Sequence, residues 1–313
     1  YNTNLLIGKA ADAKGKLSET HLCVVEADEF DRSFLTLYPD IAVVTSMDAD
    51  HLDIYGEHDE LKASFNAFMN QIKIKGHLVI RKGLEYKLNF DKLIYVHEYA
   101  AQLTPLPLGE GKGAGSFSAY NIRIEDGCFI FDYKAVSSGI KDIKMQIPGF
   151  HNIENATAAI NACILLEVPA EKIKEGLQSF KGVKRRFETI VKTDKVVYID
   201  DYAHHPTEIE AFLKSVKFLY PDKKVICIFQ PHLYSRTRDF MDGFAESLGL
   251  ADELILMDIY PARELPVEGI TSEVLFDKIK LVNKKLVTKA TLMETVKKIS
   301  PEVLVTVGAG DID

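Results

Sequence analysis

The sequence contains no apolar run approaching the ~20 residues needed to cross a bilayer, and it shows no signal peptide. Cysteine is scarce, and the four cysteines lie far apart and mostly in apolar runs, which favours reduced thiols over a disulfide framework or a zinc site. Lys and Arg number 38 against 46 Asp and Glu, and the net charge of −8 argues against nucleic acid as a partner. We therefore expect a cytoplasmic protein whose partners are small molecules, without membrane or nucleic acid, and we leave its oligomeric state open.

The chain also lacks an initiator methionine. It begins at Tyr1 and ends at Asp313, directly after an apolar stretch typical of a strand, so we expect a piece of a longer protein. Its 313 residues exceed one average domain, which predicts two domains. With 47% hydrophobic and 27% charged residues, the composition is that of an ordinary globular protein.

Short continuous apolar runs in the first half predict strands covered on both faces, at residues 21–26, 41–46, 76–80 and 92–96. Apolar residues on one helical face predict a helix between the second and third strands. They are Leu61, Phe65, Phe68, Met69 and Ile72. Residues 104–118 are rich in proline and glycine and predict a loop, and the alternation over 120–147 predicts an antiparallel hairpin turning at Asp126-Gly127. Two helices should follow, from Pro148 to about Glu167 and over about 170–180.

Regular alternation of strands and helices follows the basic stretch at residues 184–188. We expect strands at 196–199, 224–229, 253–257 and 303–307, and helices beginning at Pro206, about Thr237, Ser272 and Thr291. Such alternation is typical of a doubly wound parallel sheet with right-handed crossovers. The predicted fold class is therefore α/β in two domains. Residues 1–187 form a parallel sheet with a small antiparallel hairpin region, and residues 188–313 form the second sheet.

The densest group of titratable residues is Asp200-Asp-Tyr-Ala-His-His-Pro206, between a buried strand and a helix. Loops of this kind point their side chains into the crevice at the carboxyl edge of a parallel sheet, where ligands bind. For any two of these residues, an Asp helix cap with surface histidines is the simpler explanation. Two carboxylates, a phenol and two imidazoles in one turn instead predict a site.

A second loop, Gln230-Pro-His-Leu-Tyr-Ser-Arg-Thr-Arg238, follows the next predicted strand and opens a helix. Its His232, Arg236 and Arg238 are well placed to hold a small carboxylate. Because consecutive strands of a doubly wound sheet are usually near neighbours, we expect both loops to line one crevice.

Glu26 and His51 each follow the end of a predicted strand. If the two strands are neighbours, the carboxylate and the imidazole share one crevice. Mg²⁺ takes one or two protein ligands and fills its other positions with water and phosphate oxygens, so the pair predicts a site for a metal or a phosphate. Singly, the acidic residues around them are explained as solvated loop residues.

Asn152 and Asn155 lie three residues apart at a predicted helix start, directly after His151. Both amides face one side of the helix, and each offers the donor and the acceptor that an adenine edge requires. A plain helix cap explains Asn152 but not Asn155. At the domain boundary, Arg186 could clamp phosphoryl oxygens as the domains close, although basic pairs in linkers are commonly just solvated.

Eight strings span nearly the whole chain: Glu26-Ala-Asp-Glu29, Ala49-Asp-His-Leu-Asp53, Pro148-Gly-Phe-His-Asn-Ile-Glu-Asn155, Gly182-Val-Lys-Arg-Arg-Phe187, Asp200-Asp-Tyr-Ala-His-His-Pro206, Gln230-Pro-His-Leu-Tyr-Ser-Arg-Thr-Arg238, Asp258-Ile-Tyr-Pro-Ala-Arg-Glu264 and Gly308-Ala-Gly-Asp-Ile312. In this order they resemble the Mur ligases, ATP-dependent enzymes that build the peptide of bacterial cell-wall precursors. Within that family, the fifth and sixth strings resemble those of the alanine-adding member.

The resemblance implies a central ATPase domain over residues 1–187 and a Rossmann-like amino-acid-binding domain over residues 188–313. It also implies that ATP phosphorylates the lactyl carboxylate of UDP-N-acetylmuramate, and that L-alanine attacks the acyl phosphate in an ADP-forming ligation. The residues implied for Mg²⁺ are Glu26 and His51. Those implied for ATP are His151, Asn152, Asn155, Arg186 and Asp201. Those implied for L-alanine are Tyr202, His204, His232, Arg236 and Arg238. The residues implied in catalysis are Glu26, His51, Arg186 and Asp201.

The sequence departs from the family in two respects. The family's central domain carries a Gly-x-x-Gly-Lys-Thr phosphate loop, and no such string occurs here. Since the UDP-binding domain is missing as well, we expect this chain alone to be inactive. Leu233 stands where some relatives carry arginine, which leaves the carboxylate contact more to Arg236.

Two other functions stay open. Asp48-Ala-Asp-His51 and residues 200–205 resemble the Asp and His clusters of two-metal phosphoesterases, which hold two ions about 3.5–4 Å apart. The other is a nucleotide-binding fragment without chemistry of its own.

Overall fold

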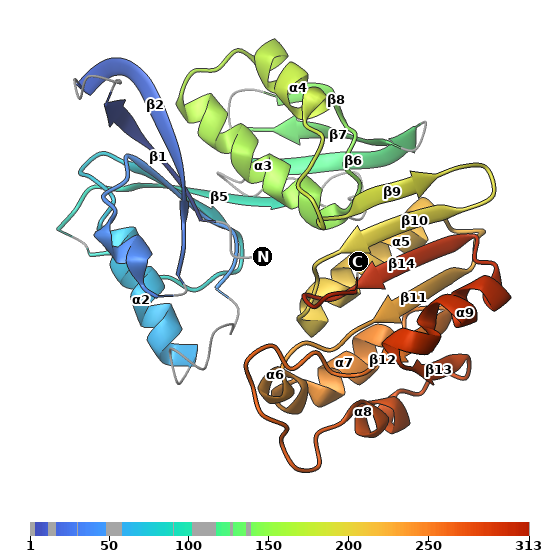
Figure 1. The fold of residues 1–313 in the computed structure, drawn as a ribbon. Coiled ribbons are helices and arrows are strands. Elements are labelled where there is room, and N and C mark those ends of the chain that lie inside the picture. Colours follow the sequence, from blue (N-terminus) through green and yellow to red (C-terminus); the bar gives the residue numbers. More distant parts are fainter. Residues whose placement is uncertain are drawn as a thin grey trace. The chain divides into compact units, whose positions relative to one another are not determined.

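The computed structural model describes residues 4–11, 17–29, 31–47, 58–89, 91–101, 117–125, 128–135 and 139–312. The protein is mixed α/β and contains two sheets (Figure 1). It divides into two compact units: unit 1 comprises residues 1–123, 130–144 and 153–178, and unit 2 comprises residues 124–129, 145–152 and 179–313. A domain boundary after residue 187 stays a prediction.

The first sheet has the order β2-β1-β3-β4-β5-β6-β7-β8. Its strands are β1 Asn4–Ala11, β2 Leu17–Ala27, β3 Ile41–Val44, β4 His77–Arg81, β5 Tyr95–Ala101, β6 Phe117–Glu125, β7 Cys128–Lys134 and β8 Gly139–Met145. Strands β3 to β6 pair in parallel, and β1 is antiparallel to both of its neighbours. The sheet is therefore parallel at its centre, as the apolar runs predict.

Three expectations for the strands of this sheet have different outcomes. We did not predict β1, and it lies between β2 and β3. The two strands are therefore not direct neighbours, which was the condition for Glu26 and His51 to share one crevice. Strand β5 covers 95–101 rather than 92–96. Strands β6, β7 and β8 are neighbours in the sheet, but the predicted turn at Asp126-Gly127 and most of the predicted loop at 104–118 lie outside the described residues.

Helices cover both faces of the first sheet. They are η1 Ser33–Thr36, α2 His58–Asn70, α3 Phe150–Leu165 and α4 Ala170–Ser179. Helix α2 packs Phe65 and Phe68 against Phe34 and the sheet. Successive side chains along β3 and β4 point to opposite faces of the sheet. Helix α3 packs its alanines at 158 and 162 against the face opposite to α2. All five apolar positions predicted for the helical face are thus core residues.

The second sheet has the order β13-β12-β11-β14-β10-β9. Its strands are β9 Glu188–Lys192, β10 Val197–Asp201, β11 Val225–Phe229, β12 Glu253–Met257, β13 Lys284–Val287 and β14 Val303–Val307. All pairs are parallel except β9 with β10. The predicted parallel sheet is confirmed, whereas the edge strands β9 and β13, both partly exposed, were missed.

The helices of unit 2 are α5 Pro206–Leu219, α6 Tyr234–Asp239, α7 Met241–Leu248, α8 Ser272–Lys278 and α9 Lys289–Ile299. Helices α5, α7 and α8 pack on one face of the second sheet, and α9 packs on the other (Figure 1). The single helix expected from about Thr237 is two helices that meet at Phe240. This layering on both faces is the doubly wound arrangement that the alternation predicts.

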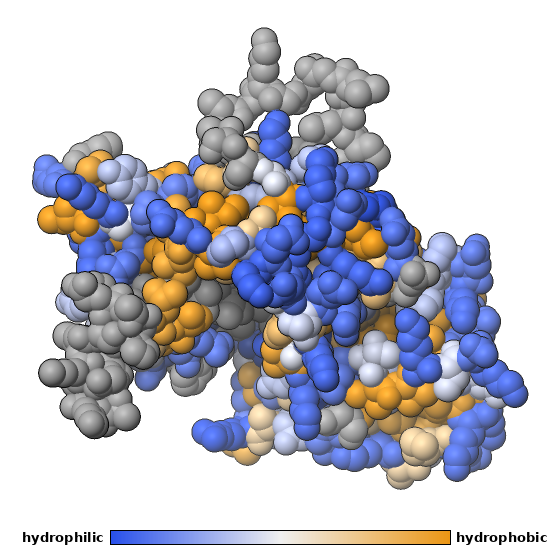
Figure 2. Space-filling view, turned by 90° about the horizontal axis from the view of Figure 1, so that it is seen from above, coloured by the Kyte–Doolittle hydropathy of each residue, from blue (hydrophilic) through white to orange (hydrophobic). Residues whose placement is uncertain are grey.

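Two properties of the chain agree with its composition. All four cysteines are free thiols, and Cys227 is fully buried. None of the helices in the described part of the chain is long and apolar enough to span a membrane. On the face shown in Figure 2, hydrophilic residues cover most of the area and hydrophobic residues form separate patches.

Candidate functional site

The carboxyl ends of β10, β14 and β11 meet at one edge of the second sheet. Val307, the last residue of β14, pairs with Asp201 on one side and with Phe229 on the other. The loops after these three strands therefore begin side by side. Strand β14 separates β10 from β11, so our expectation that β10 and β11 are near neighbours holds only through an intervening strand.

Asp201 closes β10 and is almost fully buried, with 1% of its surface exposed. Its Oδ1 accepts a hydrogen bond from the Ala203 amide at 2.8 Å, and its Oδ2 accepts one from the Phe187 amide at 2.7 Å. A carboxylate that accepts from two backbone amides holds the chain in place. The structure thus connects Asp201 to the backbone of residues 184–188, the predicted domain boundary, which lies within unit 2 and is called the hinge below. Its contact with ATP stays a prediction.

Tyr202 and His204 follow in a turn that leads into α5. The Tyr202 carbonyl accepts from Nδ1 of His204 at 2.9 Å, which leaves Nε2 as the acceptor when the ring is neutral. The two rings meet edge to face with centroids 5.4 Å apart. Glu208 at the third position of α5 accepts from the His204 amide at 2.9 Å and from the His205 amide at 3.2 Å. This capping box fixes the turn.

His232 and Arg236 lie on the loop and helix that follow β11. The centroid of the His232 ring is 6.4 Å from that of His204 and 5.7 Å from that of Tyr260, on which it stacks. A guanidinium nitrogen of Arg236 lies 3.4 Å from Nδ1 of His232. Burial first, and then the charges of Arg236 and His204, lower the pKa of His232 to about 4. The structure therefore brings the two predicted loops together.

Helix α6 begins at a strained residue. Leu233 has a φ of 70° and a ψ of 138°, a backbone conformation that residues other than glycine rarely adopt. Its amide donates to the Tyr260 carbonyl at 3.0 Å, and the Ser235 amide donates to Glu264 at 3.0 Å. The loop that contains Tyr260 and Glu264 thus holds the start of α6, close to His232 and Arg236 in the chain.

Arg238 points elsewhere. Its Nε donates to Asp239 at 2.7 Å, and more than half of its side chain is exposed. The structure places it on the same short helix as Arg236, in an exposed ion pair with its neighbour. Its contact with an amino acid stays a prediction.

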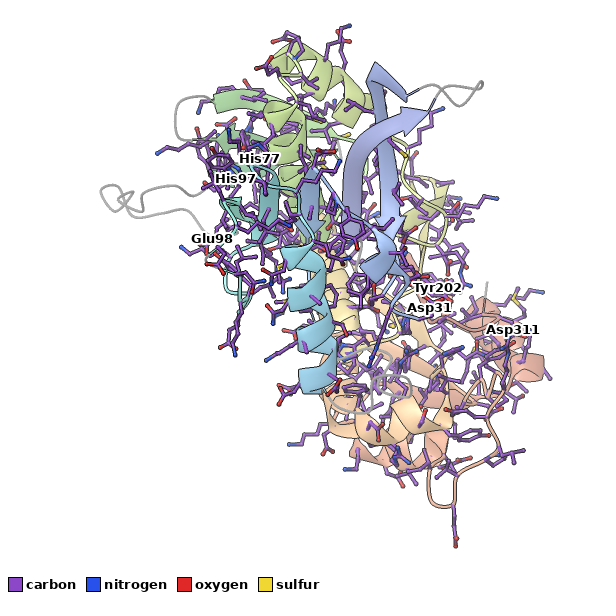
Figure 3. The ribbon with its side chains drawn as sticks, turned by 90° about the vertical axis from the view of Figure 1, so that its left-hand side faces the viewer. Asp31, His77, His97, Glu98, Tyr202 and Asp311 are labelled. Carbon is purple, nitrogen blue, oxygen red and sulfur yellow. The ribbon has the colours of Figure 1, made fainter. Side chains whose placement is uncertain are left out.

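The glycine turn after β14 packs closely against β11. A side chain at Gly308 would meet the Gln230 carbonyl, and Gly308 has a φ of 148°, so this position requires glycine. A side chain at Gly310 would meet Oε1 of Gln230 and displace that amide. Nε2 of Gln230 donates to Asp311 at 3.2 Å, and Asp311 pairs with Lys289 at 2.6 Å. Oε1 of Gln230 is buried without a hydrogen-bond partner. Figure 3 shows Tyr202 and Asp311 on unit 2.

A cavity lies at the hinge within unit 2, with a volume of about 310 Å³. Three cations line it, namely Lys181, Lys184 and Arg186, together with Glu188. The Arg186 guanidinium carbon is 5.5 Å from the centre of the Tyr202 ring. An excess of positive charge around a cavity of this size favours an anion such as a phosphate group.

His151 and Asn152 stand at the start of α3, in unit 2. Burial above all lowers the pKa of His151 to about 4, and its ring lies 6.3 Å from that of Phe187. Nδ2 of Asn152 donates to the Pro148 carbonyl at 2.6 Å, so it stabilises the turn from inside the helix rather than as its cap. Asn155 is exposed on the same helix. Their contact with a nucleotide stays a prediction.

Glu26 is exposed near the end of β2, and His51 lies outside the described residues. Asp48 and Asp50, which carry the phosphoesterase alternative, lie outside them too. Within the described ranges, no three His, Cys, Asp or Glu side chains come together as a metal site. Glu26 therefore stands alone as the described candidate for a cation ligand.

Sequence reasoning missed several residues that shape this edge, namely Arg185, Gln230, Tyr260 and Glu264. All four lie inside strings that we had already singled out. The contacts of Arg185 and Arg186 can be told apart only when the backbone path of the hinge is known. The hydrogen bond between Ser235 and Glu264 forms because two loops far apart in the sequence meet.

Comparison with protein families and known proteins agrees with this architecture. Residues 1–163 match the Mur ligase middle domain, and residues 185–312 match the Mur ligase glutamate ligase domain. The chain is 49% identical over 312 residues to a UDP-N-acetylmuramate–L-alanine ligase of Flavobacterium psychrophilum. It is also 49% identical over 313 residues to a protein of the same name from Cytophaga hutchinsonii. Both matches use 100% of this chain but only 63% and 64% of the relatives, so the chain spans just under two thirds of their length.

Solved structures share the fold. A UDP-N-acetylmuramate–alanine ligase from Thermotoga maritima superposes with a TM-score of 0.70 at 24% identity, over 99% of this chain and 66% of that one. A MurF ligase from the same organism, in complex with ADP, gives a TM-score of 0.62 at 16% identity, over 87% of this chain and 58% of that one.

Proposed function

Because the chain belongs to the Mur ligase family, we propose that it provides the ATP-binding and amino-acid-binding parts of an enzyme that joins L-alanine to UDP-N-acetylmuramate. The observation that carries the proposal is the meeting of two loops at one sheet edge, with the rings of His204 and His232 6.4 Å apart. The names of the relatives reported above, each 49% identical to this chain, support this choice of substrates. We place the reaction in the cytoplasm, with small molecules as its partners.

The amino acid is recognised by the two loops. Arg236 can only donate, so Nδ1 of His232 accepts its hydrogen bond and Nε2 of His232 carries the ring proton. The guanidinium and this N–H together offer a carboxylate two donors and a positive charge. Tyr202 and His204 wall the space beside them, which suits a side chain as small as a methyl group.

The reaction has two steps. In the first, the γ-phosphoryl group of ATP moves to the lactyl carboxylate of UDP-N-acetylmuramate and ADP leaves. In the second, the amino group of L-alanine attacks the acyl carbon, phosphate leaves and the nitrogen loses a proton. Charge on the phosphoryl group must be met by positioned cations. Arg186, in the cationic cavity at the hinge, is the described residue that we assign to it.

Nucleotide binding falls to the segment before the hinge. We assign His151, Asn152 and Asn155 to ATP, as the family resemblance implies. Buried His151 is neutral at physiological pH because its pKa is near 4, so it can accept or donate without adding charge. Asp201 joins this group through the hinge, since it holds the backbone of Phe187 next to Arg186.

The family also implies Mg²⁺, and the chemistry of Glu26 fits it in part. An exposed carboxylate at a strand end can serve as one of the one or two protein ligands that Mg²⁺ takes, and we assign His51 as the second. When bound, the ion supplies charge stabilisation for phosphoryl transfer. The chain's own contribution is to hold that carboxylate at the edge of the first sheet.

The proposal is tested on a full-length protein that contains these residues. Incubation with ATP, UDP-N-acetylmuramate and L-alanine should release phosphate and form the muramyl-alanine product. Omitting UDP-N-acetylmuramate is the control, because hydrolysis of ATP alone would continue without it. Phosphate release that does not depend on L-alanine would contradict the proposal.

A further inference from the structure

The hinge carries two consecutive arginines, and Arg185 is the one that is bound from three sides. Its Nε donates to Oδ2 of Asp200 at 3.2 Å. One terminal nitrogen donates to the Gly310 carbonyl at 3.1 Å and the other to the Gly308 carbonyl at 2.7 Å. A guanidinium presents its donors in a rigid planar fork, so three acceptors in different directions fix its orientation.

The acceptors of Arg185 belong to two neighbouring strands. Asp200 lies in β10, and its side chain is 2% exposed. Its other oxygen accepts from the hydroxyl of Thr306 in β14. Gly308 and Gly310 form the turn after β14, and that turn also packs against Gln230 at the end of β11. Arg185 therefore ties the hinge directly to the carboxyl ends of β10 and β14, and the glycine turn connects it to the residue after β11.

The backbone of the hinge is held in an unusual conformation. Arg185 and Phe187 have φ values of 57° and 51°, in the left-handed region that few residues other than glycine adopt. Such residues persist only where their surroundings hold them. The Arg185 amide donates to Glu188 at 2.7 Å, and its carbonyl accepts from the Tyr202 amide at 2.6 Å. Arg186 thus sits between two anchored left-handed residues.

Tyr202 is fixed by the same residue. Its amide is bound by the Arg185 carbonyl, and its ring lies 5.0 Å from the Arg185 guanidinium carbon. The Arg186 guanidinium carbon is 5.5 Å from the same ring. The backbone and side chain of Arg185 therefore both contact Tyr202, which is assigned to the amino acid, and Arg185 directly precedes Arg186, which is assigned to the phosphoryl group.

We propose that Arg185 is a positioning residue, which holds Arg186 and Tyr202 in the geometry that ligation requires while touching no reacting atom itself. The roles of Arg186 and Tyr202 rest on the proposed function. The clamp formed by Arg185, Asp200 and the two glycine carbonyls does not. The proposal predicts that a positive charge at residue 185 is not enough to hold the hinge, and that the planar guanidinium with its several donors is needed.

The clamp is tested by amide hydrogen exchange on the 313-residue chain. Arg185→Lys keeps the positive charge but cannot reach three acceptors at once. We expect the amides of Phe187 and Tyr202 to exchange at least about tenfold faster in this variant, while those of β11 keep their rates. Arg185→Gln removes the charge too and should show a larger effect. Lys278→Ala, which removes an exposed cation from an ion pair with Asp242, is the control and should change neither set.

Two outcomes overturn the clamp. Wild-type exchange at Phe187 and Tyr202 in Arg185→Lys shows that the fork is not needed. Equal acceleration in β11 shows that Arg185 stabilises the whole unit instead of the hinge. If Arg185→Gln destabilises the whole of unit 2, we compare the acceleration of exchange at Tyr202 with that in β11. A larger acceleration at Tyr202 supports the clamp, and an equal one overturns it.

Kinetics on the full-length enzyme test the positioning role. Arg185→Lys should lower kcat at least about tenfold and change the KM for ATP less than about twofold, since the residue is assigned to none of the substrates. An unchanged kcat overturns the proposal. A wild-type enzyme without ligase activity refutes the proposed function instead, and the exchange result then stands independently.

Discussion

Arg236 lies four residues after His232, and its guanidinium nitrogen is 3.4 Å from Nδ1 of that ring. The arginine forces the imidazole into the form that carries its proton on Nε2, because a guanidinium cannot accept a hydrogen bond. With a pKa near 4, the ring stays neutral at physiological pH. The pair therefore presents one positive charge and several N–H donors, which matches a single carboxylate.

Removing the cation of this pair should weaken amino-acid binding selectively. In the full-length enzyme we expect Arg236→Ala to raise the KM for L-alanine roughly 10- to 150-fold, because a charge-assisted hydrogen bond is worth about 1.5–3 kcal/mol. The KM for ATP should stay nearly unchanged. Steady-state kinetics with each substrate varied in turn measure both values. Lys278→Ala is the control, and equal weakening of ATP and alanine would rule out the carboxylate role.

The 313-residue chain alone should show no ligase activity. It has no Gly-x-x-Gly-Lys-Thr string to hold the β- and γ-phosphates with backbone amides and a lysine. Incubation with ATP, L-alanine and UDP-N-acetylmuramate should release no phosphate above background. Turnover at the rate of the full-length enzyme would contradict our account of what this chain lacks.

Much of the fold could be predicted because buried parallel strands leave a plain signal. The runs that became β3, β4, β11, β12 and β14 are predominantly apolar, and all lie inside sheets. The edge strands of the second sheet carry no such signal. Strand β13 contains two lysines, and β9 is exposed along most of its length. Their pairing depends on contacts with neighbours, which local sequence does not show.

The candidate site could be predicted as loops but not as contacts. The pattern placed Tyr202, His204 and His232 after buried strands, and the structure brings their loops together. The same pattern could not show that Arg185 and Arg186 have different contacts, because both are cations in one linker. It also could not show that Asp201 uses its carboxylate on backbone amides, which follows only from the path of residues 185–187.

Glu26→Ala in the full-length enzyme should reduce the rate far more than the stability. An exposed carboxylate contributes little to the fold, so we expect the free energy of unfolding to fall by less than about 1 kcal/mol. Loss of a Mg²⁺ ligand removes charge stabilisation from phosphoryl transfer, which is worth several kcal/mol. Glu85→Ala, at another exposed carboxylate of unit 1, is the matched control. Full activity of Glu26→Ala at saturating Mg²⁺ would contradict the assignment.

Unit 1 should lose stability in acid through a pair of histidines. Nδ1 of His77, on β4, and Nε2 of His97, on β5, are 2.9 Å apart. Figure 3 labels both residues. Burial lowers the pKa of both rings, and the charge of His77 adds to this for His97. The unfolded chain then binds more protons than the folded one, so the pair's contribution is present above the unfolded pKa of ~6.5 and is lost as pH falls through the folded values.

Urea unfolding of unit 1, followed at pH values between about 7.5 and about 5.5, measures this effect. We expect the free energy of unfolding to fall with pH in the wild type and to fall less steeply in His97→Gln. Lys73→Ala, which removes an exposed ion pair with Asp40, controls for a general loss of stability and should keep the wild-type slope. Identical slopes in wild type and His97→Gln would remove the pair as the cause.

Asp201→Asn separates a structural role of this residue from a nucleotide contact. Each carboxylate oxygen accepts from a backbone amide, at Phe187 and at Ala203. An asparagine keeps one acceptor and turns an NH₂ group toward the other amide, which leaves that buried N–H unsatisfied. Such a loss costs about 1–3 kcal/mol, so unit 2 should unfold at a lower urea concentration. Asp222→Asn, at an exposed turn, makes the same chemical change and should alter stability by less than about 0.5 kcal/mol. If Asp201→Asn instead weakens ATP binding while the unfolding curve of unit 2 stays unchanged, the carboxylate serves the nucleotide and the hinge is held without it.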